Sequence, residues 1–313
     1  MRLHMKLSMR AKDRWLGVVS PVVLLVLWEV AARLEWIDAR FFPAPSAIFE
    51  KLVALTASGE LWINLWASLK RLFWGSLLGG IPALGIGILM GLYRPIRTAI
   101  DPLISETYPI PKSAILPLVL LIFGLGEMSK IVMVALGVFY PVVINTITGV
   151  LQIDRIYLDV GKNFRASRWQ TFRTIALPGA LPSIMAGVKI GVGLGLILIA
   201  ISEMVGAKTG IGFMIWDAWQ VLSVETMYVG LLVIAIIGFV LTLILNEVES
   251  WLLPWRRERQ IAGHFKNFLQ GRQTSCIEPS KPNSSCAHRL PQSSQPSASP
   301  LPHRTPGPSR SPS

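Results

Sequence analysis

The sequence predicts an all-α membrane protein with about six transmembrane helices, and two features of its composition support that fold class. Of the 313 residues, 52% are hydrophobic and only 15% are Asp, Glu, Lys or Arg. A typical soluble domain has about 25% charged residues. The hydrophobic residues also gather in uncharged runs long enough to cross a bilayer core. A single soluble globule is therefore excluded, and two cysteines are too few for a disulfide scaffold.

The N-terminal part predicts a cytoplasmic segment over residues 1–14 and a first transmembrane helix over 15–33. Five basic residues precede the apolar run, and Pro21 is expected to bend it. A cleaved signal peptide is the competing interpretation. No A-x-A-like cleavage site follows the run, and Glu29 and Arg33 lie at its end, so an uncleaved span is preferred.

A core of five further spans is predicted over residues 62–250. The second span begins near Leu61 and ends at Leu92, and the third, rich in proline, is expected to be an interrupted helix. Short helices are expected after Ser46 and in the polar segment 203–228. Small residues four apart predict closely packed faces on the second and fifth spans. The last four spans are predicted over 103–123, 131–150, 184–201 and 228–245. The small residues of the two packed faces are Gly75, Gly79, Gly87, Gly91, Gly187, Gly191 and Gly195.

The C-terminal part predicts a basic cytoplasmic segment over 251–272 and a disordered tail over 273–313. The tail holds nine Pro and eleven Ser, a composition that cannot bury a core. Both cysteines lie in the tail without metal-ligand spacing, and none of the four His lies in a span. No metal site and no histidine proton relay are therefore expected.

The basic residues predict the orientation of the spans. Seventeen Lys and Arg fall on the side of both termini and of the 151–183 segment, against seven on the other side. The positive-inside rule places both termini and that segment in the cytoplasm. The net charge of +12 is thereby explained by topology. No basic stripe with interleaved aromatics is present, so no nucleic-acid partner is expected.

The 151–183 segment has the internal pattern of two short helices. Ile156, Val160 and Phe164 share one face of the first. Ser167-Arg-Trp-Gln is a capping box that predicts the start of the second, which Leu177-Pro178-Gly179 is expected to end. Two such helices form a protrusion suited to insertion into a groove on a partner protein.

These residues resemble the EAA loop of ABC-importer permeases, whose pattern is EAA-xxx-G, nine residues, then IxLP. Asp159-Val-Gly161 stands for EAA, and Ile175, Leu177 and Pro178 match at the correct spacing. Arg165 replaces the pattern's glycine, a residue suited to a turn with positive φ. Three other sequence segments, 109–130, 163–184 and 202–215, are similar to those of the nitrate/sulfonate/taurine branch of these permeases. Residues 42–52 resemble the segment that precedes the core in that branch.

The resemblance implies a type I ABC importer permease fold and a non-catalytic subunit in the bacterial inner membrane. It implies four kinds of partner: a cytoplasmic ATPase dimer, a second permease copy, an extracytoplasmic binding protein and the lipid bilayer. No GxxxxGK[ST] occurs, so ATP would be bound by the partner and no cofactor by this chain. The expected coupling residues are Asp159, Gly161, Phe164, Arg165, Ala166, Ser167, Trp169, Phe172, Ile175, Leu177 and Pro178.

Four ionisable residues in or beside spans are candidates for the transport pathway or its gate: Glu106, Lys112, Lys189 and Glu203. For the two lysines, snorkelling or ion pairing is the preferred alternative to substrate contact. The expected cargo is a small anionic solute of the nitrate, sulfonate, taurine or bicarbonate class. An ion-gradient-driven transporter or channel is the alternative, although neither mid-membrane charge pairs nor an inverted repeat is visible in the sequence.

Overall fold

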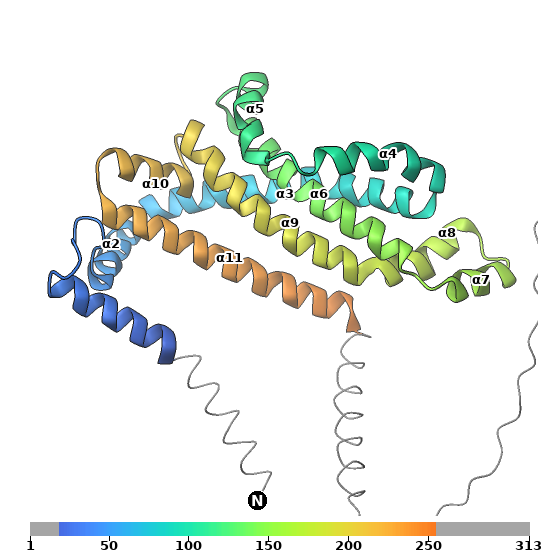
Figure 1. The fold of residues 1–313 in the computed structure, drawn as a ribbon, viewed down its shortest axis with the longest axis horizontal. Helices are drawn as coiled ribbons and strands as arrows, with labels where there is room; N and C mark the ends of the chain where they lie inside the picture. The colour runs from blue at the N-terminus through green and yellow to red at the C-terminus, as the bar shows by residue number, and fades with distance from the viewer. Residues whose placement is uncertain (1–18, 255–313) are drawn as a thin grey trace, which may run out of the picture. The chain divides into compact units, whose positions relative to one another are not determined.

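The computed structural model describes residues 19–254. Within that range the chain is helical and has no strand. The predicted segment 1–14, the predicted segment 251–272 from residue 255 on, and the 273–313 tail lie outside the described residues. So does the start of the first span, whose described part is a helix over 19–33. Figure 1 shows this first helix beside α2 (Pro45–Ala57).

Three long helices form the centre of the fold: α3 (Glu60–Leu92), α6 (Glu127–Leu151) and α9 (Leu177–Gly206). Helix α6 packs against both of the others. A fourth long helix, α11 (Val224–Leu252), lies alongside α9 (Figure 1). Each is long and apolar enough to cross a bilayer. The predicted all-α fold with several spans is confirmed for the described residues.

The predicted third span is a bent pair rather than a rod. Helix α4 (Arg94–Thr107) and the segment Lys112–Phe123, which contains α5 (Leu116–Phe123), meet at 87°. The break was predicted, but the start at 103 was wrong, because α4 already begins at Arg94. Pro95 occupies its first turn, where the N–H that proline lacks would have no partner. Counted as one broken span, the pair makes five candidate spans among the described residues.

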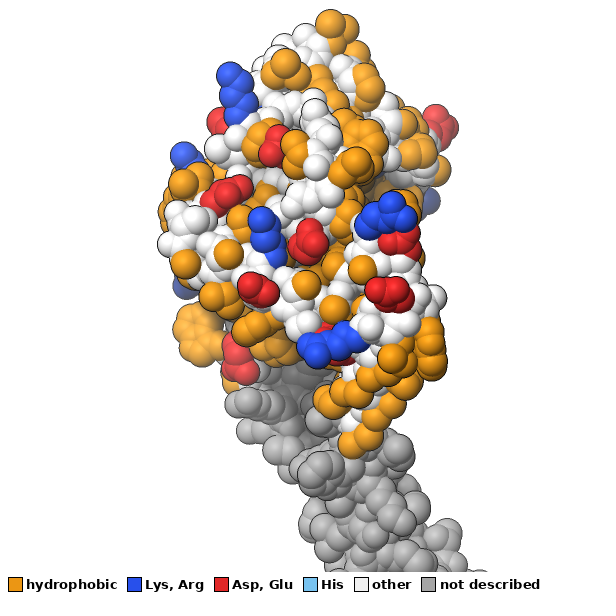
Figure 2. All heavy atoms as spheres, turned by 90° about the vertical axis from the view of Figure 1, so that its left-hand side faces the viewer, with side chains coloured by type: hydrophobic (Ala, Val, Ile, Leu, Met, Phe, Trp, Pro, Cys, Tyr) orange, Lys and Arg blue, Asp and Glu red, His pale blue; other side chains and the backbone are white. Residues whose placement is uncertain are grey.

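Two short helices lie at one end of the long helices and two at the other (Figure 1). Helices α2 (Pro45–Ala57) and α10 (Ile211–Gln220) both pack on α11 and define what we call the α10 end. Figure 2 views that end and shows acidic and basic side chains mixed among apolar ones. Helices α7 (Arg155–Asn163) and α8 (Arg168–Thr171) lie at the opposite end, called the loop end.

The glycine faces predicted on α3 and α9 are confirmed as helix–helix contacts. A Cβ on Gly79 would lie 2.2 Å from the carbonyl oxygen of Ala135, and one on Gly187 would lie 2.7 Å from Cβ of Asn145. Side chains at these positions would push α3 and α9 away from α6. Close backbone approach of this kind is how helices associate in lipid, where hydrophobic burial gives little drive.

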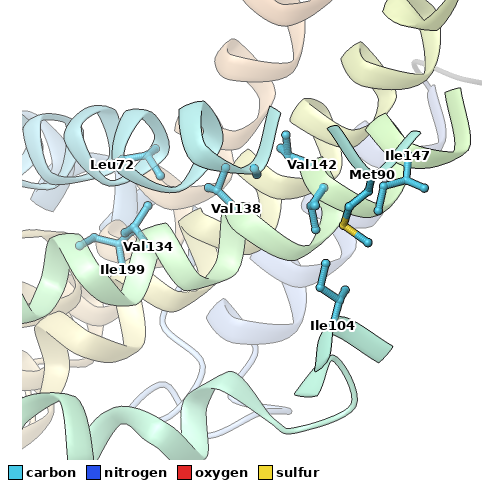
Figure 3. Packing of buried hydrophobic residues seen from close by; sticks show 10 residues of the cluster. Leu72, Met90, Ile104, Val134, Val138, Val142, Ile147 and Ile199 are labelled. Atoms are coloured by element: carbon cyan, nitrogen blue, oxygen red, sulfur yellow. The ribbon is translucent and has the colours of Figure 1, made fainter. Parts of the chain in front are cut away.

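The main apolar cluster fills the seams between these helices. Figure 3 shows Leu72 of α3, Val134 and Val138 of α6 and Ile199 of α9 together, with Met90, Ile104 and Ile147 further along. Val134 is fully buried, although the protein's outer surface is also apolar. Packing by shape therefore decides which faces of the helices meet, and the remaining apolar faces are left for lipid or for other chains.

Candidate functional site

The 151–183 segment forms a defined protrusion at the loop end. Asp154 begins α7, since its Oδ1 accepts the backbone N–H of Ile156 at 3.0 Å. The predicted capping box at the second helix is confirmed. The backbone N–H of Gln170 donates to Ser167 Oγ at 3.2 Å, and Gln170 Oε1 accepts the N–H of Ser167 at 2.8 Å. Both helix starts are thus fixed by side chains.

Arg165 occupies the left-handed position that ends α7. Its φ is +51°, and the N–H of Ala166 donates to the carbonyl of Gly161 at 2.9 Å, the long bond of a Schellman turn. Glycine is the usual residue at this position because it has no Cβ to clash. The turn expected of the loop pattern is therefore kept even though arginine replaces glycine. The side chain of Arg165 is exposed.

The second half of the loop differs from the prediction. The helix does not end at Leu177-Pro178-Gly179, because α8 passes through a π-helical turn, Phe172–Ala176, straight into α9. Pro178 comes just after the π-helical turn and does not interrupt the helix. The second helix of the protrusion is accordingly continuous with a spanning helix.

The motif residues divide into an interior and an exterior set. Gly161 is buried, and a Cβ there would lie 3.2 Å from Cδ1 of Ile175, so α7 packs on the π turn. Leu177 packs on the small cluster that joins α6 to α9. By contrast Phe164 is 83% and Trp169 67% exposed, although Trp169 also stacks on half-buried Phe172 at 5.4 Å. Further exposed apolar side chains of α7 are Ile156, Tyr157 and Val160.

The four pathway candidates do not form one site. Glu106 is exposed on α4. Lys112 donates to the carbonyls of Thr107, Tyr108 and Ile110 at 2.8–3.1 Å and lies 4.0 Å from the ring centre of Tyr140. It thus binds the carbonyl end of α4, where a cation is favoured, and holds the bend.

Lys189 pairs with Glu249 and contacts Asn246, which joins α9 to α11. The pairing that was preferred for this lysine is therefore present. Glu203 lies at the α10 end of α9, far along the helix from Lys189. Among the described residues, no hydrogen bond or ion pair joins any two of the four candidates.

Glu203 belongs to a buried polar cluster that sequence reasoning did not find. We call it the Arg71 network: Asn64, Ser68, Arg71, Glu127, Lys130 and Glu203. Arg71 Nη1 donates to Glu203 Oε1 at 2.8 Å and to the carbonyl of Thr209 at 2.6 Å, while its Nε and Nη2 hold both oxygens of Glu127 at 2.6–2.7 Å. The side chains of Arg71 and Glu203 are 2% and 1% exposed.

The rest of the Arg71 network fixes the connection between α9 and α10. Ser68 Oγ donates to the carboxylate of Glu203 and accepts the N–H of Ile211 at 2.8 Å. Asn64 Oδ1 accepts the N–H of Gly210 at 2.9 Å, and buried Lys130 binds the carbonyls of Leu125, Gly126 and Gly206. The sequence contains a pattern that could have predicted this network. Asn64, Ser68 and Arg71 are spaced to lie on one face of a helix, just before an uncharged run.

The fold is that of a polytopic membrane protein, and the loop between α6 and α9 exposes large apolar side chains. Sequence comparison identifies its family. Residues 63–258 match the family described as binding-protein-dependent transport system inner membrane component, and the chain belongs to that family.

Relatives and a solved structure agree with this assignment. The chain is 36% identical to the taurine transport system permease protein TauC of Escherichia coli over 83% of its length and 98% of that protein. It is 33% identical to the putative aliphatic sulfonates transport permease protein SsuC of Bacillus subtilis, covering 79% and 90%. It is 31% identical to the nitrate import permease protein NrtB of Synechocystis, covering 75% and 88%.

The fold is shared with a chain of the inward-facing MetNI methionine ABC transporter. The two superpose with a TM-score of 0.54 at 19% identity, over 61% of this chain and 97% of that one. At this identity the likeness concerns the fold, and it confirms the expected type I importer permease architecture.

Proposed function

We propose that this chain is the membrane-spanning, non-catalytic subunit of an ATP-driven importer for a small anionic solute of the sulfonate, taurine, nitrate or bicarbonate class. The relatives named as taurine, sulfonate and nitrate permeases support the solute class. Two copies would line the pathway, an extracytoplasmic binding protein would deliver the solute at the α10 end, and an ATPase dimer would bind at the loop end.

The observation that carries the proposal is the exposed apolar surface of a rigid loop. Solvated loops seldom expose several large apolar side chains together, whereas protein interfaces bury them. Phe164 and Trp169 point out of a segment whose helix starts are both capped and whose second half is continuous with α9. Binding of a partner here would therefore act on a spanning helix without an intervening flexible link.

Energy coupling then follows from differential binding. The ATPase dimer changes its separation with nucleotide, and it shifts the permease only if it binds one permease conformation more tightly than the other. The exposed residues Asp159, Phe164, Arg165 and Trp169 would contact the ATPase, while Gly161, Ile175, Leu177 and Pro178 would keep the loop's shape.

Uptake in membrane vesicles tests this function. The permease, its cognate ATPase and binding protein, and a labelled sulfonate or nitrate should give uptake that requires ATP. Uptake that persists without the ATPase and follows an ion gradient would contradict the proposal and favour a secondary transporter.

The proposed orientation has a separate test, because both native cysteines lie at 276 and 286 in the C-terminal tail. A membrane-impermeant maleimide should label them in inside-out vesicles. Labelling in right-side-out vesicles without permeabilisation would reverse the topology.

A further inference from the structure

We propose that the groove between α3, α9 and α11 is a binding site for an anionic phospholipid, with the headgroup phosphate on Lys70 and one acyl chain along the groove. The inference does not depend on which solute is transported. It depends on the chain lying in a membrane, which its family establishes.

The groove exists because α3 and α11 each pack on α9 with a gap between them. Its volume is about 480 Å³, within the range of sites for small ligands, roughly 300–1,000 Å³. Val192 of α9 contributes to its lining, and the other lining residues come from α3 and α11. They are Trp66, Leu69, Lys70, Leu72, Phe73, Trp74, Ser76, Leu241, Ile244 and Leu245.

The lining is apolar apart from Lys70 and Ser76, and Lys70 is its one charged residue. Such a surface fits hydrocarbon along its length and an anion at one point. From Lys70 to Ser76 the groove follows α3 for about 9 Å, at 1.5 Å per residue. An extended acyl chain matches this shape, whereas a compact hydrophilic solute would leave most of the apolar lining unsatisfied.

Lys70 lies at the level of the membrane where lipid phosphates are found. The uncharged run that follows, 72–92, has 21 residues and a length of about 31 Å, close to the roughly 30 Å of a hydrocarbon core. Lys70 therefore sits at the edge of that core. Trp66 and Trp74, one turn on either side, are 70% and 50% exposed, as expected of indoles in a membrane interface.

The lysine is exposed and makes no hydrogen bond or ion pair within residues 19–254. The charge of Lys70 acts on the carboxylate of Glu127 without a direct bond. Both oxygens of that carboxylate are bound by Arg71. An ammonium group at the edge of the hydrocarbon is stable when it reaches a phosphate. Lipid satisfies this need directly, whereas a second copy of the chain would have to bring a carboxylate to the same point.

Native mass spectrometry of the purified full chain with added phosphatidylglycerol or phosphatidylcholine tests the site. We expect one phosphatidylglycerol per chain to be retained in preference to phosphatidylcholine. Lys70→Gln should weaken retention of phosphatidylglycerol about fivefold, the effect of one basic residue at a lipid surface. The matched control is Lys51→Gln on α2, outside the lining, which should leave retention unchanged.

A second variant separates the acyl groove from the charge. Ser76→Leu fills the groove without changing charge and should weaken both lipids equally. Equal phosphatidylglycerol retention in Lys70→Gln and Lys51→Gln would overturn the site. So would a photo-crosslinker at Trp74 that reacts with a second copy of the chain rather than with lipid, or displacement of the bound lipid by a labelled sulfonate.

Discussion

The two ends of the long helices differ in which side chains are buried and which are exposed. At the α10 end, α3, α6 and α9 meet through buried charges, and Arg71 and Glu203 are almost fully enclosed by the chain itself. At the loop end the connection between α6 and α9 leaves its largest apolar side chains exposed. A buried ion pair makes the chain sensitive to the loss of either partner, whereas apolar surface left exposed on a loop is available to another protein. The comparison distinguishes residues that maintain the fold from residues that we propose contact a partner.

The largest stability effect should come from breaking the Arg71 network. Glu203→Leu leaves the guanidinium of Arg71 buried without its enclosed partner, and loss of one member of a buried ion pair costs about 3–5 kcal/mol. The melting temperature of the purified protein in detergent should fall sharply.

A control and a double variant sharpen that prediction. Glu127→Gln should cost much less, because the side chain of Glu127 is 65% exposed. Arg71→Met combined with Glu203→Leu should recover part of the loss, since an apolar pair can replace a buried ion pair. A double variant no more stable than Glu203→Leu alone would contradict the role assigned to the ion pair.

A smaller loss is expected in the seam between α3 and α6. A Cβ at Gly79 would lie 2.2 Å from the backbone of Ala135, so Gly79→Ala must move a helix, at a cost of about 1–3 kcal/mol. Gly85 lies on the same helix with nothing within 4 Å of its Cβ position. Gly85→Ala should therefore be neutral or stabilising, by up to about 1 kcal/mol. Equal melting temperatures for the two variants would show that the seam tolerates a methyl group.

The smallest effect is expected at the turn that ends α7. Arg165 adopts φ +51°, which costs a non-glycine residue about 1–2 kcal/mol. Arg165→Gly should relieve this cost, partly offset by the flexibility that glycine gives the unfolded chain. Hydrogen exchange at the amide of Ala166, whose bond to Gly161 closes the turn, should slow slightly. Arg165→Ala keeps the Cβ and should give no such slowing. Faster exchange in the glycine variant would contradict the assigned turn.

Local patterns in the sequence predicted local structure well. The capping box at Ser167 and the glycine faces of α3 and α9 depend on spacing within one helix, and the structure confirms them. The predicted end of the second loop helix was wrong, because the helix continues past Pro178 after a π-helical turn.

Contacts between distant segments were beyond the sequence. Arg71 and Glu203 are 132 residues apart, and only the packing of α3 against α9 brings them together. The same holds for Lys189, whose partners Asn246 and Glu249 lie 57 and 60 residues further along the chain. An ionisable residue in a span therefore indicates that the residue has a role. The structure is needed to decide whether it pairs with another residue of the chain or acts in transport.

The proposed difference between the α10 end and the loop end is tested most directly by the affinity of the cognate ATPase for permease variants of known melting temperature. Phe164→Ala should weaken ATPase binding about thirtyfold, equivalent to about 2 kcal/mol for an anchoring aromatic residue, with no change in melting temperature. The control is Trp251→Ala, which removes another aromatic side chain, 80% exposed at the C-terminal end of α11 and outside the 151–183 loop. This variant should leave binding unchanged. Full ATPase affinity in Phe164→Ala, or a fall in its melting temperature like that of Glu203→Leu, would contradict the account.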